Sequence, residues 1–263
     1  MELLRNIVRR VFATSSAPYQ MLNRALDFIQ ISRKYGVARY AELMRIEGGS
    51  AGELAVPMAF GNLLHPILIR PGTDDTKTVI DNIVREEWGN FVPNGDPKWM
   101  IDAGAYIGDT SAYFLSRFPG LNIVALEPDS LTFEFTRNNL GPYGSRVMLH
   151  NCGLYIHEGS VRFNSGQTSS AITTDGEMEI PVTTIPSLLA KYSIERLDIL
   201  KMDIEGAEES IFPGDVEPWL SRVDLLIIEF HSEAGEALIT RVLKQYGFSM
   251  RRYRSIWYCR KTS

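Results

Sequence analysis

Apolar positions follow two different patterns along the chain. In residues 1 to about 50 they recur at helical spacing, as in YQMLNRALDFIQISRKYG, which ends at Gly36, a residue typical of a helix C-cap. The apolar run LHPILIR at residues 64–70 predicts a strand, and PGTDDTKTVIDNIVREEWGNF after it predicts a turn followed by a helix. We therefore expect residues 1–95 to form a mostly helical N-terminal cap.

From about residue 98, short apolar runs alternate with helical patterns. Strands that alternate with helices form a parallel sheet covered on both faces. The closing segments FSMRRY and SIWYCRK predict an antiparallel hairpin, which adds an antiparallel edge strand. Residues 96–263 are therefore predicted to form one α/β domain with a mostly parallel sheet. The five predicted parallel strands are KWMIDAG, NIVALEP, VMLHNCG, LDILKMDIEG and VDLLIIEFH, with further short strands in GSVRFNS and EIPVTTI.

The composition argues against several classes of protein. The chain has 263 residues, of which 44% are hydrophobic and 22% charged, as in an ordinary soluble domain. Its formal net charge of -5 argues against a nucleic-acid partner, which normally meets a basic face. Two cysteines form no disulfide framework, and we expect reduced thiols in a cytoplasmic protein. No apolar run reaches the ~20 residues of a membrane span.

The stretch IDAGAYIGDTS places a glycine loop between a predicted strand and a helix, an arrangement typical of nucleotide-like ligands. A dinucleotide fingerprint that begins at Gly104 needs glycines at positions 106 and 109, where this chain has Tyr106 and Asp109. The chain instead spaces Gly104 and Gly108 four residues apart. This pattern disfavours an NAD-dependent oxidoreductase, which is the alternative enzyme, and favours a smaller anion such as the carboxylate of an amino acid.

Neighbouring positions fit the two halves of S-adenosylmethionine. Amides near Asp109 and Thr110 would bind a carboxylate at the start of the helix, and Asp102 would pair with a cationic amino group. Glu127 ends the second strand, where a carboxylate accepts hydrogen bonds from a ribose diol. That role is shared by NAD and S-adenosylmethionine, so Glu127 alone does not distinguish them.

Polar residues also end the next three predicted strands. They are Asn151, Asp203 and His231, and together with Glu127 they would surround one crevice, because ligands bind outside the carboxyl ends of the strands in an open α/β sheet. We therefore predict one site formed by loops that are far apart in the sequence.

A resemblance to the FkbM-type methyltransferases rests on IDAGAYIGDTS, ALEPD and DILKMDIEGAEESIF followed by LLIIEFH, over roughly residues 68–231. It implies a class I methyltransferase (Rossmann-like) fold and an S-adenosylmethionine-dependent enzyme that O-methylates hydroxyls of natural products or sugars. The cofactor contacts that it implies are Asp102, Gly104, Ala105, Tyr106, Gly108, Asp109, Thr110, Ser111, Glu127, Pro128, Asn151, Cys152 and Asp203.

A neutral hydroxyl is a poor nucleophile, so a general base would assist the transfer. The candidates for catalysis are Asp203, Glu205 and His231. A divalent metal held by Asp203 with Glu229 or His231 is not favoured, because no tight ligand motif is visible. The alternative outside the enzymes is a cofactor-binding module without catalysis, against which the three polar residues argue. The identity of the acceptor, a small-molecule or glycan hydroxyl, is left open, and so is the formation of a homodimer. Because the N-terminal region lies outside the resemblance, we expect the cap formed by residues 1–95 to help to select the substrate.

Overall fold

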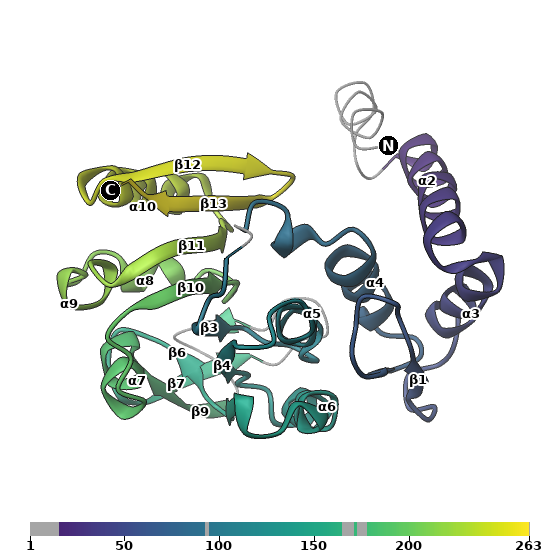
Figure 1. Ribbon diagram of the computed structural model, residues 1–263, viewed down its shortest axis with the longest axis horizontal. Helices are drawn as coiled ribbons and strands as arrows, with labels where there is room; N and C mark the ends of the chain where they lie inside the picture. Colours follow the sequence, from purple (N-terminus) through teal and green to yellow (C-terminus); the bar gives the residue numbers. More distant parts are fainter. Residues whose placement is uncertain (1–15, 93–94, 165–170, 173–177, 263) are drawn as a thin grey trace. The chain divides into compact units, whose positions relative to one another are not determined.

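A seven-stranded sheet forms the centre of the α/β part of the computed structural model (Figure 1). Its strand order is β12-β13-β11-β10-β3-β4-β5, and the last five strands of that order are parallel. The structure describes residues 16–92, 95–164, 171–172 and 178–262. The bounds of the parallel strands are Trp99–Ala103 (β3), Asn122–Leu126 (β4), Val147–His150 (β5), Leu197–Met202 (β10) and Val223–Glu229 (β11).

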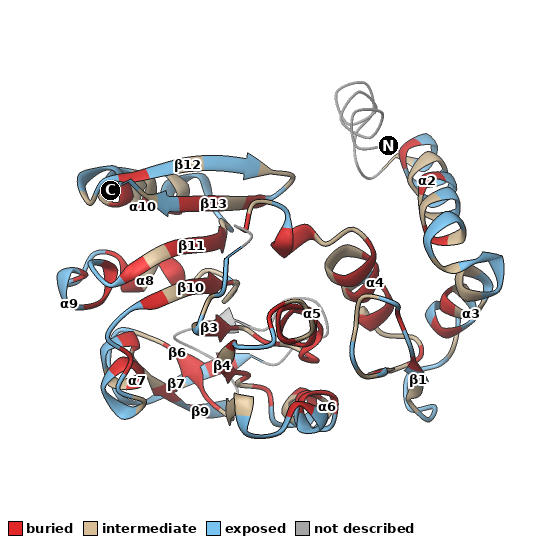
Figure 2. Ribbon diagram, viewed as in Figure 1, coloured by how far each residue is buried: buried red, intermediate tan, exposed pale blue. Residues whose placement is uncertain are grey.

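The C-terminal hairpin extends this sheet at one side. Strand β13 (Ile256–Lys261) pairs antiparallel with β11, and β12 (Phe248–Tyr253) pairs antiparallel with β13 and forms the edge. Figure 2 shows that β12 is largely exposed whereas β10 and β11 are largely buried. The predicted fold class, α/β with a mostly parallel sheet and an antiparallel addition from the hairpin, is confirmed.

Helices cover both faces of the sheet. In Figure 1, α5 and α6 lie on one side, and α7 and α8 lie on the other. Apolar side chains of α7, α9 and α10 form one buried cluster with side chains of β4, β10 and β11. Because both faces are covered, the parallel strands are nearly continuous apolar runs. The helix bounds are Asp109–Arg117 (α5), Ser130–Leu140 (α6), Ile185–Lys191 (α7), Glu208–Ile211 (α8), Glu217–Leu220 (α9) and Glu233–Gln245 (α10).

A second, four-stranded sheet has the order β6-β9-β7-β8 and contains the further short strands predicted from the sequence. Phe163, Ile180 and Val182 form its small buried core. A 3-10 helix, η3 (Gly141–Arg146), links α6 to β5. The bounds of the strands are Gly153–Leu154 (β6), Gly159–Asn164 (β7), Ala171–Ile172 (β8) and Met178–Thr183 (β9).

The chain divides into two units, of which the smaller comprises the described residues up to Val56 together with Ile69–Ile80. Helix α2 (Ala17–Tyr35) ends at Gly36, as predicted, because Gly36 takes a φ of +89°. The other elements that precede β3 in the chain, some of which belong to the larger unit, are α3 (Val37–Glu47), β1 (Val56–Met58), β2 (Ile67–Ile69), α4 (Asp75–Val79), η1 (Ile80–Val84) and η2 (Glu87–Gly89).

Within the smaller unit, the buried carboxylate of Asp75 fixes the turn before α4, where it accepts hydrogen bonds from the backbone and the guanidinium of Arg70. The first fifteen residues of the predicted helical cap lie outside the described residues, and the substrate-selecting role of residues 1–95 stays a prediction. Among the described helices, none has the length and apolar character needed to cross a membrane. Cys152 and Cys259 are both buried free thiols.

Candidate active site

The loop between β3 and α5 requires glycine at both positions that the sequence indicated. Gly104 has a φ of +80°, and a Cβ there would lie 1.9 Å from the carbonyl oxygen of Asp203. Gly108 has a φ of +83°, and its Cβ would lie 2.9 Å from the side chain of Leu140. Both the conformation and the close approach exclude a side chain. The loop therefore brings the end of β3 against the residue that follows β10.

Glu127 connects this loop to the end of β4. Its buried carboxylate accepts hydrogen bonds from the backbone N–H groups of Tyr106 (2.8 Å) and Asp129 (2.9 Å). Tyr106 has a φ of +50°, which is uncommon for a residue with a side chain. Burial raises the pKa of Glu127 to about 8, although the two N–H groups oppose the shift. A carboxylate that accepts two hydrogen bonds has room for about two more.

A buried ion pair lies next to the loop. Lys201 is opposite Asp102 in the register of β10 and β3, and its Nζ lies 3.2 Å from Asp102 Oδ1. Ser111 donates a 2.6 Å hydrogen bond to the other carboxylate oxygen, and Lys201 also donates to the carbonyl oxygen of Gly104. Burial lowers the pKa of Lys201, but the charges of Asp102 and Asp203 outweigh burial and raise it above its usual value.

Lys201 is a site residue that the sequence analysis missed. The sequence predicts the amino group of a cofactor as the cationic partner of Asp102, whereas in the structure Lys201 is that partner. The one indication in the sequence was a lysine within the apolar run LDILKM, because lysine is rarely buried without a partner. Only the register of the two strands identifies that partner.

The start of α5 uses part of the predicted anion site for its own contacts. The backbone N–H of Thr110 donates to Asp109 Oδ1 (2.9 Å), and the side-chain amide of Asn82 donates to Asp109 Oδ2 (3.0 Å). The N–H of Ala105 donates to the carbonyl oxygen of Leu126 (2.8 Å). The Thr110 amide that we expected to bind a carboxylate therefore already has an acceptor within the chain.

Asn151 fixes the ends of β4 and β5 relative to each other. Its side-chain amide donates to the carbonyl oxygens of Glu127 (2.9 Å) and Pro128 (3.1 Å). Cys152 beside it is buried in the main apolar cluster, and burial raises the pKa of its thiol to about 11. The structure thus brings the predicted residues of the second and third strand ends together, with Asn151 as a positioning contact.

The three predicted catalytic side chains meet at the ends of β10 and β11. His231 Nε2 lies 3.6 Å from Asp203 Oδ1 and 3.6 Å from Glu205 Oε2. All three side chains are partly exposed, between 23% and 39%. Glu205 has a φ of +53°, a costly conformation for a residue with a side chain and one that recurs at functional sites.

Glu208 positions this group and was not predicted. Its buried carboxylate accepts hydrogen bonds from the N–H groups of Ile204 (2.8 Å) and Gly206 (2.8 Å), which fixes the turn after β10. Glu208 Oε1 also lies 3.6 Å from His231 Nδ1. Burial lowers the pKa of His231, but Glu208 and the two other carboxylates outweigh burial and raise it to about 9.

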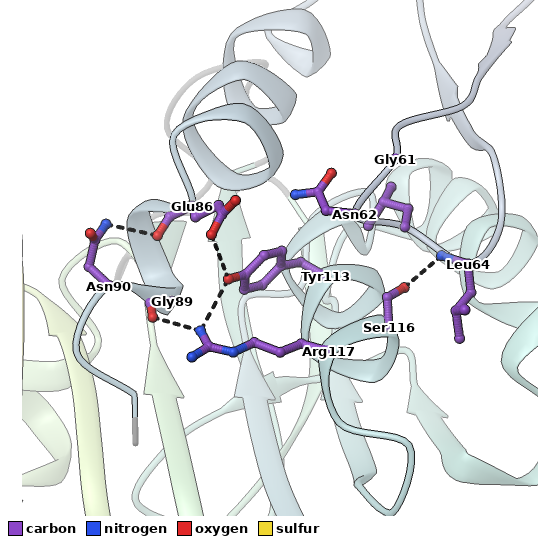
Figure 3. A pocket seen from close by; sticks show the side chains of 10 residues that line it. Gly61, Asn62, Leu64, Glu86, Gly89, Asn90, Tyr113, Ser116 and Arg117 are labelled. Atoms are coloured by element: carbon purple, nitrogen blue, oxygen red, sulfur yellow. Dashed lines mark hydrogen bonds between the residues drawn. The ribbon is translucent and has the colours of Figure 1, made fainter. Parts of the chain in front are cut away.

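A cavity of about 510 Å³ lies at a different place, along α5 (Figure 3). There the hydroxyl of Tyr113 donates to Glu86 (3.1 Å), and Arg117 donates to the carbonyl oxygen of Gly89 (2.9 Å). None of the residues predicted for the site lines this cavity, so we do not assign it to the reaction. Its lining is Gly61, Asn62, Leu63, Leu64, Glu86, Gly89, Asn90, Tyr113, Ser116 and Arg117.

A parallel sheet of this order, extended by an antiparallel hairpin and carrying a glycine loop after its first strand, defines the Rossmann-like fold of the class I methyltransferases. The chain belongs to the family described as the methyltransferase FkbM domain, whose model matches residues 102–250. The resemblance drawn from the sequence is confirmed, and the protein is a methyltransferase.

Individual relatives are distant in sequence. Methyltransferase 1 of Beauveria bassiana is 25% identical over 197 residues, which cover 64% of this chain and 79% of that protein. Hexuronic acid methyltransferase AglP of Haloferax volcanii is 23% identical over 154 residues, which cover 57% of this chain and 62% of that protein. Among solved structures, a precorrin-6y C5,15-methyltransferase from Geobacter metallireducens aligns with a TM-score of 0.44 and 14% identity, over 68% of this chain and 88% of that one.

Proposed function

We propose that this protein transfers a methyl group from S-adenosylmethionine to a hydroxyl oxygen of a small molecule or glycan. The observation that carries the proposal is the contact between Glu127 and the loop from Gly104 to Gly108. A buried carboxylate at the end of the second parallel strand, hydrogen-bonded to the glycine loop of the first, is the arrangement that accepts hydrogen bonds from the ribose of a nucleoside.

The residues around Glu127 fit such a cofactor. Two backbone N–H groups already donate to the carboxylate, and burial raises its pKa. Two ribose hydroxyls would supply the missing hydrogen bonds. When bound, S-adenosylmethionine supplies a methyl group on a positively charged sulfur. The chain has Tyr106 and Asp109 where a dinucleotide fingerprint needs glycine, which supports this cofactor over NAD.

Asp203 is the residue that we assign to take the proton of the acceptor hydroxyl. Its backbone packs directly against Gly104, which belongs to the loop assigned to the cofactor. This contact is the reason for choosing Asp203 among the three predicted catalytic residues. Glu205 and His231 lie beside it and would bind and orient the acceptor. Their shared task is to align the acceptor oxygen with the methyl group, because a displacement at carbon needs attack opposite the leaving sulfur.

The class of acceptor is supported by the partly exposed polar group at the strand ends and by the names of the relatives. A hydroxyl acceptor needs proton acceptors and donors beside it, and Asp203, Glu205 and His231 supply both. One relative is named for a hexuronic acid, a sugar derivative with several hydroxyls. The same polar group argues against a cofactor-binding module without catalysis.

Calorimetric titration with S-adenosylhomocysteine tests the cofactor, with NAD as the competing ligand. We expect S-adenosylhomocysteine alone to bind, and Glu127→Gln to weaken binding at least about tenfold, because a hydrogen bond to a charged group contributes about 1.5–3 kcal/mol. Glu134→Gln is the matched control, since that carboxylate is exposed on α6 and pairs with Arg137. Binding of NAD alone, or equal affinity in the Glu127 variant, would contradict the proposal.

A further inference from the structure

We propose that Asp203, Glu205 and His231 bind a divalent metal ion of the Mn²⁺ or Zn²⁺ type beside the site of methyl transfer. The inference rests on the proposed function, because it assigns the ion to the same acceptor pocket. One ligand atom from each of the three side chains lies within 4.8 Å of the other two. His231 Nε2 is 3.6 Å from each carboxylate oxygen, a separation that lets one ion reach each pair at about 2.2 Å.

The orientation of His231 supports a ligand role. Its Nε2 faces Asp203 and Glu205, whereas its Nδ1 faces Glu208 Oε1 at 3.6 Å. Glu208 is only 2% exposed and is fixed by two backbone N–H groups, so it is a rigid partner for the second ring nitrogen. A metal-binding histidine almost always donates its other ring N–H to a carboxylate, a backbone carbonyl or a water, which fixes the tautomer and the direction of the ring.

The balance of charge at the strand ends also favours a cation. Lys201 lies closer to Asp102 (3.2 Å) than to Asp203 (3.9 Å), so most of its charge is compensated by Asp102. The carboxylates around this end of the sheet outnumber the basic side chains, and a divalent ion would offset the excess. Among the described residues that interact here, the acidic side chains are Asp102, Asp203, Glu205, Glu208 and Glu229, and the basic ones are Lys201 and His231.

The donor set indicates which ions would bind. One imidazole nitrogen with two carboxylate oxygens suits Mn²⁺, Fe²⁺ or Zn²⁺, whereas Mg²⁺ and Ca²⁺ prefer oxygen alone. Three protein ligands leave coordination positions for water or for an acceptor oxygen. The sequence analysis did not favour a metal, because the ligands come from the ends of two strands and form no contiguous motif. Their proximity is a product of the parallel pairing of β10 and β11.

The test uses the full-length protein after dialysis against a chelator and titration with MnCl₂, followed by electron paramagnetic resonance. We expect one Mn²⁺ per chain and a coupling between the ion and one imidazole nitrogen. Glu205→Gln and His231→Gln should each weaken Mn²⁺ at least about tenfold, and the second should abolish the nitrogen coupling. Glu195→Gln removes an exposed carboxylate before β10 and should leave Mn²⁺ affinity unchanged. MgCl₂ should compete only weakly.

Circular dichroism of each variant identifies any that fails to fold. If one of the two ligand variants fails to fold, the other still tests the metal site. Absence of bound Mn²⁺ at millimolar concentration, or wild-type Mn²⁺ affinity in both folded ligand variants, would overturn the metal site. Titration of the metal-free protein with S-adenosylhomocysteine separates this result from the proposed function. If S-adenosylhomocysteine binds and Mn²⁺ does not, only the metal site is refuted. If S-adenosylhomocysteine fails to bind with and without Mn²⁺, the proposed function is refuted.

Discussion

Replacing Lys201 with methionine removes the positive charge of a buried ion pair and keeps most of the side-chain volume. The Lys201 side chain is 3% exposed and Asp102 is fully buried, with 3.2 Å between the charged atoms. The substitution leaves the Asp102 carboxylate with the Ser111 hydroxyl but with no opposite charge beside it. Breaking a buried ion pair on one side typically costs about 3–5 kcal/mol, and we expect a loss of that size in the free energy of unfolding.

The double variant Lys201→Met/Asp102→Asn separates charge from packing. Asparagine at 102 keeps an oxygen that accepts the hydrogen bond from Ser111 and carries no charge that needs a partner. We therefore expect the double variant to be more stable than Lys201→Met alone, with a coupling energy of about 2 kcal/mol.

The assay is urea denaturation of the wild type, both single variants and the double variant, followed by far-ultraviolet circular dichroism. Additive losses, with the double variant as unstable as the sum of the single variants, would refute the electrostatic reasoning. Such a result would mean that Lys201 contributes through packing and its hydrogen bond to Gly104 rather than through its charge.

Three further predictions concern the site. Gly104→Ala should lose at least about 2 kcal/mol of stability and most binding of S-adenosylhomocysteine, since φ is +80° and the new Cβ would meet Asp203; Gly141→Ala, with a φ of -50° and open space, is the control, and equal stability of the two variants would contradict the argument. Glu127 has its pKa raised to about 8, so its contribution to stability is full below the unfolded value near 4.5 and is lost as the pH rises through 8; the wild type should lose stability relative to Glu127→Gln over that window by several kcal/mol, and parallel pH profiles from thermal unfolding would refute it. Glu205→Gly should be about 1 kcal/mol more stable than Glu205→Ala, because only glycine relieves the φ of +53°, and urea midpoints in the reverse order would exclude that strain.

The positions of the strand ends could be predicted from the sequence alone. Apolar runs that are buried on both faces have a composition and length that are visible without a structure, and each run ended in a polar residue that the fold then brought to one edge. Gly36, Gly104 and Gly108 could also be recognised, since their backbone angles are local properties of the chain. The family followed from the same local segments.

The partners of those residues were decided by the tertiary structure. Lys201 is opposite Asp102 only because β10 pairs with β3 in one register, and a shift by one residue would turn its side chain to the other face of the sheet. Glu208, at the start of α8, accepts a hydrogen bond from the turn after β10 and faces His231, which follows β11. The backbone N–H of Thr110 donates to the side chain of Asp109. Local propensity determines which residues lie at a strand end, whereas the pairing of strands and the packing of helices determine what each of them contacts.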